Sequence, residues 1–427
     1  AVAALCGHAG AAPAKLATTT THPGITHETW SDPAIPARIH VVRVDLTSQE
    51  LALYATKESD RGLTTTGFSD RIGAAVAVNG DAFAVAGYLP RGLAIGDSTP
   101  WTNTADDATS ALFHLRRVAD GSHERTAAAI VTPEVVTTPE LLPEGTQGAI
   151  AGRPLLIRAG VVEPSFSCTD PITIACQRAP RTAIAISADG NTLWLVVVNG
   201  WQQGSIGMTA AELAGFLRTT YGPHMAMVLD SGSSSTLVLD GALANTPSDG
   251  VERTVANHLA VKFGALPRGQ LVGLVCKDDI IACRDDDSLR LPGAQVTLDD
   301  GRVDVVGSDA FYDFTNITPR LACVTVKKTG FKSKRQCQIV DSGTLSFNSV
   351  ALEQGVDLPD AGATDAGPGI DAGDLLDGGF VPDGGNPEIG EGGGCCDAGR
   401  KAPERQFFLV VLVGFLLVRR RGTTVGR

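Results

Sequence analysis

Apolar and polar positions alternate through much of the first two thirds of the chain, with the period of β-strands. Residues 39–46 (IHVVRVDL) show this period, and the runs at 51–56, 74–80 and 83–89 continue it. Residues 182–200 predict a hairpin whose turn lies at Asp189-Gly190 or Gly190-Asn191. Because strands are many and helices few, residues 37–265 are predicted to form an α+β domain, strand-rich and mixed α/β.

One helix is marked clearly within this domain. Thr209 and Glu212 have the spacing of a capping box, and Leu213, Phe216 and Leu217 form one apolar helical face. Gly222-Pro223 ends the helix. The next apolar run, 225–229, is a strand that delivers Asp230 to a Gly/Ser turn, residues 231–235. A carboxylate at a strand end beside such a turn is where α/β folds often place chemistry.

The flanking segments predict further units. Residues 1–36 are rich in Thr, Pro and Ala and predict a flexible N-terminus or the remnant of a signal peptide. Residues 270–342 resemble the carboxypeptidase regulatory-like β-sandwich, which implies a small all-β domain without catalysis. The matching segments are Pro292-Gly293-Ala294, Asp300-Gly301, Phe311 to Phe314, Ile317-Thr318-Pro319 and Gly330-Phe331.

The C-terminal part is expected to lack a core of its own. Residues 343–394 predict a disordered acidic linker, rich in Gly and Asp. Residues 395–427 contain two cysteines, the apolar run 407–418 and then three arginines, 419–421. This tail, with its short hydrophobic helix, resembles the MYXO-CTERM sorting tail of myxobacterial surface proteins. The resemblance implies export to the envelope or surface of a Gram-negative bacterium, with membrane contact through the tail before processing.

Charge and cysteine content narrow the class of protein. Residues 343–396 carry −10 of the net charge of −12, which leaves −2 for the rest of the chain, so nucleic acid is an unlikely partner. The chain has nine cysteines, with Cys168 and Cys176 close together and four more at 276, 283, 323 and 337. Such grouping favours disulfides and an oxidising compartment. A zinc site is the rival interpretation, but the chain has no C-x-x-C pair and no His after residue 258.

A set of short motifs spreads over residues 75–262, at 79–83, 90–92, 152–154, 181–184, 199–200, 207–209, 212–213, 229–230, 232, 234–236, 245, 247–250, 252–253 and 257–259. In this order they resemble the phosphodiester glycosidase family, whose members include the enzyme that uncovers mannose 6-phosphate by removing N-acetylglucosamine. Four positions depart from the family pattern: Ser231 and Ser233 replace glycines, Ala185 replaces a Gly and Asn199 an Asp. A Ser that had to adopt positive φ would cost about 1 kcal/mol.

The resemblance implies hydrolysis of a sugar-1-phosphodiester in a glycan or sugar-phosphate polymer. Asp230 is expected to be the nucleophile or general base, with Glu252 or Asp249 as the second carboxylate. Arginine side chains suit the phosphate, because a guanidinium can hold it with two hydrogen bonds. The residues expected to bind substrate are Asn79, Asp81, Arg181, Gly232, Ser234, Ser235, Asn245, Arg253, Asn257 and His258. No group of side chains has the spacing of metal ligands, so neither a metal site nor a cofactor is predicted.

Two other classes of protein are alternatives to the glycosidase. Asp-Ser-Gly occurs at 230–232 and 341–343, as in pepsin-like proteases, but too little chain follows Asp341 for a second lobe. A non-catalytic module that binds exopolysaccharide is the other alternative. The serines in the 231–235 turn favour the binding module, and the intact Asp230, Glu252 and Arg253 favour the enzyme.

Overall fold

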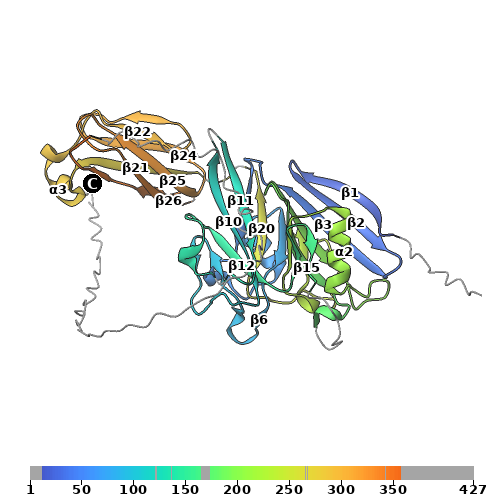
Figure 1. Cartoon of the computed structure of the whole chain (residues 1–427). Helices are drawn as coiled ribbons and strands as arrows, with labels where there is room; N and C mark the ends of the chain where they lie inside the picture. Colours follow the sequence, from blue (N-terminus) through green and yellow to red (C-terminus); the bar gives the residue numbers. More distant parts are fainter. Residues whose placement is uncertain are drawn as a thin grey trace, which may run out of the picture. The chain divides into compact units, whose positions relative to one another are not determined.

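The computed structural model describes residues 12–356 except 121–122, 136, 165–173, 265, 267 and 342. The predicted linker beyond residue 356, the sorting tail and its hydrophobic helix, Cys168 and the first eleven residues lie outside this part. Within it, the predicted strand-rich architecture is confirmed (Figure 1). No helix among these described residues is long and apolar enough to cross a membrane.

The largest sheet has eight antiparallel strands and forms the base of the first domain. In spatial order they are β1 (Ala14–His22), β2 (Ile25–Asp32), β3 (Ala37–Asp45), β16 (Thr192–Val198), β15 (Arg181–Ile186), β17 (Met225–Val228), β13 (Leu155–Arg158) and β14 (Val161–Val162). The predicted hairpin is confirmed as β15–β16, with Gly190 at φ 67° in its turn. The expectation of a loose N-terminus is wrong for β1 and β2, because their Thr-rich sequence pairs with the edge of this sheet.

Two smaller sheets complete the first domain. One orders β11 (His123–Val131), β10 (Ala111–Asp120), β12 (Gly148–Gly152), β8 (Ile95–Gly96) and β9 (Thr99–Pro100). The other orders β19 (Ala242–Leu243), β18 (Leu237–Leu239), β5 (Val76–Asn79), β20 (His258–Phe263) and β4 (Leu51–Ala55). A short ribbon pairs β6 (Phe83–Ala84) with β7 (Leu89–Pro90). Buried aliphatic side chains from all three larger sheets share one core, so strand ends from different sheets meet at its edge.

Two helices cover outer faces of these sheets. The predicted capping box is confirmed, since Thr209 caps α2 (Ala210–Thr220) and Glu212 bonds back to it. Leu213, Phe216 and Leu217 of α2 pack on the eight-stranded sheet, and Figure 1 shows α2 beside β3 and β15. The second helix, α1 (Thr65–Ile72), packs Phe68 against β5, β18 and β20.

The second domain is a small all-β unit with its own core. One sheet holds β24 (Phe311–Ile317), β21 (Gly269–Lys277), β27 (Leu345–Phe347) and β28 (Val350–Leu352). The other orders β23 (Val303–Val305), β22 (Gln295–Leu298), β25 (Arg320–Lys327) and β26 (Lys334–Val340). A short helix, α3 (Ile280–Asp285), follows β21. The boundary predicted at residue 342 is wrong, because β27 and β28 add to β21 in parallel and extend the domain to residue 352.

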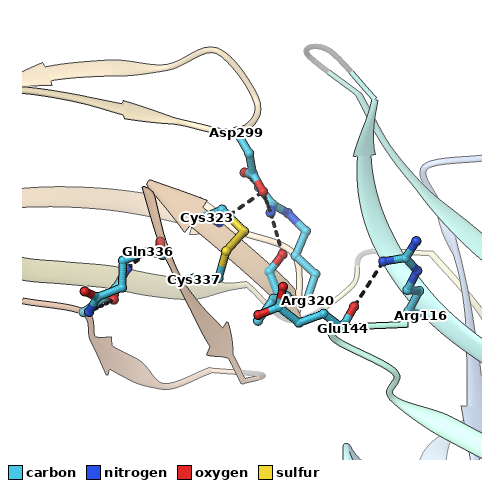
Figure 2. Close-up of a disulfide and its surroundings, with 9 residues drawn as sticks. Arg116, Glu144, Asp299, Arg320, Cys323, Gln336 and Cys337 are labelled. Carbon is cyan, nitrogen blue, oxygen red and sulfur yellow. Dashed lines mark hydrogen bonds and ion pairs between the residues drawn. A yellow bond between two sulfur atoms is a disulfide. The ribbon is translucent and has the colours of Figure 1, made fainter. Parts of the chain in front are cut away.

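Disulfides and one buried cation stabilise this domain. Cys276 bonds to Cys283 and Cys323 to Cys337, so the disulfide expectation is confirmed for these two pairs. Figure 2 shows the second pair beside Arg320, whose guanidinium donates to Asp299 at 2.7 and 2.8 Å. Arg320 is fully buried and also donates to Glu124 of β11 at 3.0 Å. A buried guanidinium needs such carboxylate partners to offset its lost hydration.

Candidate active site

Asp230 lies where two sheets meet. It follows β17, the buried strand predicted to deliver it. Its backbone N–H donates to the Gly80 carbonyl at 2.8 Å, and the Asn79 Nδ2 donates to the Asp230 carbonyl at 2.9 Å. The end of β5 is thereby tied to the end of β17, and the Asp230 carboxylate is fixed at this junction.

Asn79 holds this junction from inside and was expected instead to bind a sugar. Its side chain is fully buried. Its Oδ1 accepts hydrogen bonds from the Thr182 hydroxyl at 2.7 Å and from the Thr236 amide at 3.1 Å. Both ends of the amide therefore contact the protein, and the structure places Asn79 behind the site as a support for the Asp230 backbone.

The turn after Asp230 accommodates its serines without strain. Ser231 is extended (φ −126°, ψ −177°), and Ser233 is not among the described residues with positive φ. The left-handed position, at φ 70°, is Gly232. The cost considered for serine in place of glycine therefore does not arise at either position. Ser234 and Ser235 are buried in the turn, and Ser234 is close enough to Asp230 to lower the pKa of its carboxyl.

A second carboxylate, Asp81, is buried beside Asp230. Asp81 is 2% exposed, its backbone N–H donates to Asn257 Oδ1 at 2.8 Å, and its Oδ2 accepts the Gly92 N–H at 2.8 Å. Burial raises the pKa of Asp81 to about 7, against the lowering effects of the Gly92 amide and the Arg153 charge. The Asp230 charge raises it further. Asp81 is therefore close to half-protonated at neutral pH.

Burial also raises the pKa of Asp230, but more groups oppose the change. The Ser234 side chain, the Ser231 amide and the positive charges of Arg253 and Arg91 all lower it. The groups that favour the ionised form are therefore more numerous at Asp230 than at Asp81.

Asp230 opens onto a cavity of about 500 Å³, large enough for a small ligand. Four arginines of the described chain line it, together with apolar and small polar side chains. The lining residues are Ala82, Phe83, Arg91, Thr109, Arg153, Pro154, Ala175, Arg181, Leu229, Asp230, Ser231 and Arg253. A positive lining around one carboxylate favours an anionic ligand with an electrophilic centre.

Contacts with the protein fix the direction of three of these arginines. Arg181 is buried and donates from Nε to the Met208 carbonyl at 2.9 Å. Burial lowers the pKa of Arg181 to about 10, so it remains a cation at neutral pH. Arg153 donates to the Thr109 hydroxyl at 3.1 Å, and the Arg253 guanidinium stacks 5.2 Å from the centre of the Phe83 ring. These side chains are positioned before any ligand arrives, which lowers the entropic cost of binding.

The two carboxylates proposed from sequence as partners of Asp230 lie elsewhere. Glu252 accepts the Thr66 N–H at 3.0 Å and caps the N-terminus of α1. An acidic side chain at that end is favoured by the unpaired amides of the first turn. Asp249 is exposed and accepts hydrogen bonds from Ser233 Oγ at 2.9 Å and Ser248 Oγ at 3.2 Å. Neither lines the cavity, and the carboxylate whose charge acts on Asp230's surroundings is the buried Asp81 behind the lining.

Three further residues expected to bind substrate are buried supports. Asn245 bridges Leu237 N–H (2.7 Å) and the Ser235 carbonyl (3.0 Å). Asn257 positions Asp81, as described above. His258 is fully buried, contacts the Thr56 hydroxyl through Nδ1 at 3.0 Å and stacks on Phe68. Burial lowers the pKa of His258 to about 3, so it is neutral and has no route to a ligand.

Arg91 and Arg153 are the site residues that sequence reasoning did not select. Both belong to segments quoted for the family resemblance, at 90–92 and 152–154, so the signal was present. The role of Arg153 was not readable because β13, which follows it, is brought beside β17 by a pairing between distant segments. Among the described residues, no group of three or more His, Cys, Asp or Glu side chains is arranged to hold a metal ion.

A smaller hollow of about 290 Å³ lies away from these residues, lined in part by Tyr54, Lys57 and Arg71. Lys57 pairs with Asp97 at 3.0 Å and Arg71 is paired with Asp60. These two cations of the smaller hollow are thus paired within the protein.

The chain is similar to known proteins over the segment that contains Asp230 and the four arginines. The family model described as phosphodiester glycosidase matches residues 73–262. An uncharacterized SPbeta prophage-derived protein of Bacillus subtilis, YomE, is 37% identical over 84 residues, which are 20% of this chain and 13% of that protein. The chain therefore spans a small part of the length of this curated relative.

Solved structures give a weaker likeness. The zebrafish N-acetylglucosamine-1-phosphodiester alpha-N-acetylglucosaminidase catalytic domain, auto-inhibited by its pro-peptide, has a TM-score of 0.43 and 18% identity. That match covers 60% of this chain and 86% of the zebrafish chain. A hypothetical protein from Synechocystis has a TM-score of 0.42 and 18% identity, covering 59% of this chain and 64% of its own.

Proposed function

We propose that the chain is a hydrolase that cleaves the glycosidic C–O bond of a sugar-1-phosphodiester in a glycan or glycopolymer. The observation that carries the proposal is the position of Asp230 at the wall of a cavity lined by Arg91, Arg153, Arg181 and Arg253. The phosphodiester glycosidase match spans all of these residues. Such a substrate combines one negative charge with an electrophilic anomeric carbon, and the cavity offers a partner for each.

The arginines bind the phosphate and stabilise it as it leaves. When the bond between C1 and the phosphate oxygen breaks, its electron pair stays on that oxygen and the negative charge of the phosphate grows. Guanidinium groups respond to that growth more strongly than to the ground state, because they are already oriented toward it. A phosphate is a good leaving group, so proton donation to it is less necessary than for an ordinary glycoside.

Asp230 acts on the other side of the breaking bond, the sugar ring, which becomes positively charged in the transition state. Its carboxylate stabilises the oxocarbenium-like transition state as nucleophile or as general base to water. The water oxygen ends on C1, and the products are a free sugar and a phosphate monoester. Asp81 acts through Asp230: as long as Asp81 keeps its proton, it adds no negative charge beside the incoming phosphate.

The test is turnover of a panel of monosaccharide 1-(methyl phosphate) diesters, with N-acetylglucosamine, glucose and mannose as the sugars. We expect one or more to be hydrolysed, and Asp230→Asn to lower kcat by about 10³-fold or more. Glu252→Gln is the matched control, because Gln keeps the oxygen that caps α1. Retained turnover in Asp230→Asn, or a similar loss in Glu252→Gln, would contradict the assignment. Tight binding without turnover of any diester would favour the exopolysaccharide-binding alternative.

We further propose that the protein is exported and works at the cell surface. The Cys276–Cys283 and Cys323–Cys337 disulfides support an oxidising compartment. The sorting tail remains a prediction from the sequence. Fractionation of the producing cells, with non-reducing peptide mapping of both pairs, tests the proposal, and a cytosolic protein with free thiols would contradict it.

A further inference from the structure

Trp201 is a large aromatic side chain held at the surface. It is 54% exposed and its backbone has φ 54°, in the left-handed region that bulky residues avoid. Its indole Nε1 donates to the Arg178 carbonyl at 3.1 Å. The ring also lies against Gly232, where a Cβ would come within 2.9 Å of it. Exposure and fixed orientation together indicate a surface that is kept in place for contact with something outside the chain.

The ring lies at the rim of the arginine-lined cavity. Gly232 follows Ser231 and Asp230, which both line that cavity. The Gly232 N–H donates to the Pro180 carbonyl at 2.9 Å, and the next residue, Arg181, lines the cavity as well. Trp201 therefore lies over two segments whose neighbouring residues form the cavity wall.

An exposed carboxylate belongs to the same rim. Asp249 accepts the Ser233 hydroxyl, one residue beyond Gly232. Gln202, next to Trp201, donates to the carbonyls of Thr246 and Pro247 at 2.9 and 3.0 Å, which ties the Trp201 segment to the Asp249 loop. A flat aromatic face beside an exposed carboxylate matches the two surfaces of a pyranose, its C–H face and its hydroxyl groups.

We propose that Trp201 and Asp249 form a sugar subsite outside the cavity, so that the substrate extends at least one pyranose beyond the sugar phosphate. The inference rests on the proposed function for the identity of the substrate. It assigns Asp249 a binding role and Trp201 a stacking role, and it makes a longer glycan, and not a free monosaccharide phosphodiester, the preferred substrate.

The kinetic test compares two substrates: the fastest monosaccharide 1-(methyl phosphate) of the panel above and its disaccharide homologue. Trp201→Gly removes the ring and suits positive φ, Trp201→Phe keeps an aromatic face, and Phe347→Ala removes an exposed ring, 65% exposed, from the second domain. We expect Trp201→Gly to raise KM for the disaccharide substrate about 5- to 10-fold, with little change for the shorter one. Compared with the unaltered protein, we expect Trp201→Phe to keep most of the affinity for the disaccharide substrate and Asp249→Asn to weaken it. Phe347→Ala is expected to leave this affinity unchanged.

A binding measurement separates this inference from the proposed function. Neutral trisaccharides of N-acetylglucosamine, glucose and mannose are titrated into ¹⁵N-labelled protein, and the Trp201 indole signal is identified by its loss in Trp201→Phe. Its selective shift with at least one trisaccharide supports the subsite even when no phosphodiester is hydrolysed. The subsite is overturned if no trisaccharide moves that signal, or if Trp201→Gly affects both substrates equally.

Discussion

Replacing Asn79 by Ala tests whether this residue supports the site or binds the substrate. The substitution removes three hydrogen bonds, to the Asp230 carbonyl, the Thr182 hydroxyl and the Thr236 amide. Each contributes about 1 kcal/mol net, and a buried group left without a partner costs about 1–3 kcal/mol more. With three bonds lost and one buried group left without a partner, we expect the free energy of unfolding to fall by roughly 4–6 kcal/mol, a large share of the stability of an ordinary domain.

Urea denaturation followed by tryptophan fluorescence measures this loss, with Asn191→Ala as the control. Asn191 lies in the exposed β15–β16 turn, where its side chain contacts Asp189, so its removal changes stability by less than about 1 kcal/mol. A direct sugar ligand would give a different result, with stability unchanged and KM raised. That outcome for Asn79→Ala would refute the supporting role assigned here.

Three further predictions concern charge. Arg153→Met is expected to lower kcat/KM about 10- to 100-fold and to weaken inhibition by inorganic phosphate. The control Arg284→Met, at an exposed arginine, is expected to change neither quantity. Equal inhibition by phosphate in both variants would contradict the phosphate-binding role of Arg153. Because the pKa of Asp81 is about 7, kcat/KM is expected to fall above pH 7 as the Asp81 carboxyl loses its proton and becomes negatively charged. An equal fall in the pH profile of Asp81→Asn would exclude Asp81 as the cause. Burial lowers the pKa of His114 to about 4. Between pH 6.5 and 4 the unfolded chain therefore binds a proton at His114 that the folded chain does not bind. The stability contributed by neutral His114 is lost as the pH falls through this range. In His114→Asn the free energy of unfolding, measured by urea denaturation, should therefore decline less steeply with falling pH, by up to about 1.4 kcal/mol per pH unit. An unchanged slope would contradict the role of His114 burial.

Local patterns predicted the elements whose structure depends on neighbours in sequence. The α2 capping box, the β15–β16 hairpin and the strand before Asp230 depend on a few adjacent residues, and each was confirmed. The strands β1 and β27 were missed: β1 joins its sheet through a hairpin with β2, and β27 joins its sheet through long-range pairing with β21. Their own sequences, rich in Thr or very short, give little periodic signal.

Part of the site could be predicted from motifs in the sequence, and the rest depends on contacts between distant segments. Asp230, Arg181 and Arg253, which the motif order groups, line one cavity, and their catalytic and binding roles stay predictions. Glu252 and Asn79 have the same side-chain chemistry as site residues; the contact of Glu252 with the α1 N-terminus and the burial of Asn79 distinguish them as supports. Asp81 was expected to bind substrate, but its pairing with Asp230 depends on the β5 and β17 ends meeting, which no spacing in the sequence encodes.

The central claim is that water attacks the sugar and not the phosphorus. The direct test is to let the protein hydrolyse one of its sugar-1-phosphodiester substrates in H₂¹⁸O and to analyse the phosphate monoester product by mass spectrometry. The proposed cleavage of the C1–O bond leaves every phosphate oxygen unlabelled, because the bridging oxygen departs with the phosphorus. One ¹⁸O in the released phosphate monoester would show P–O cleavage and would contradict the glycosidase mechanism assigned to Asp230 and the arginine-lined cavity.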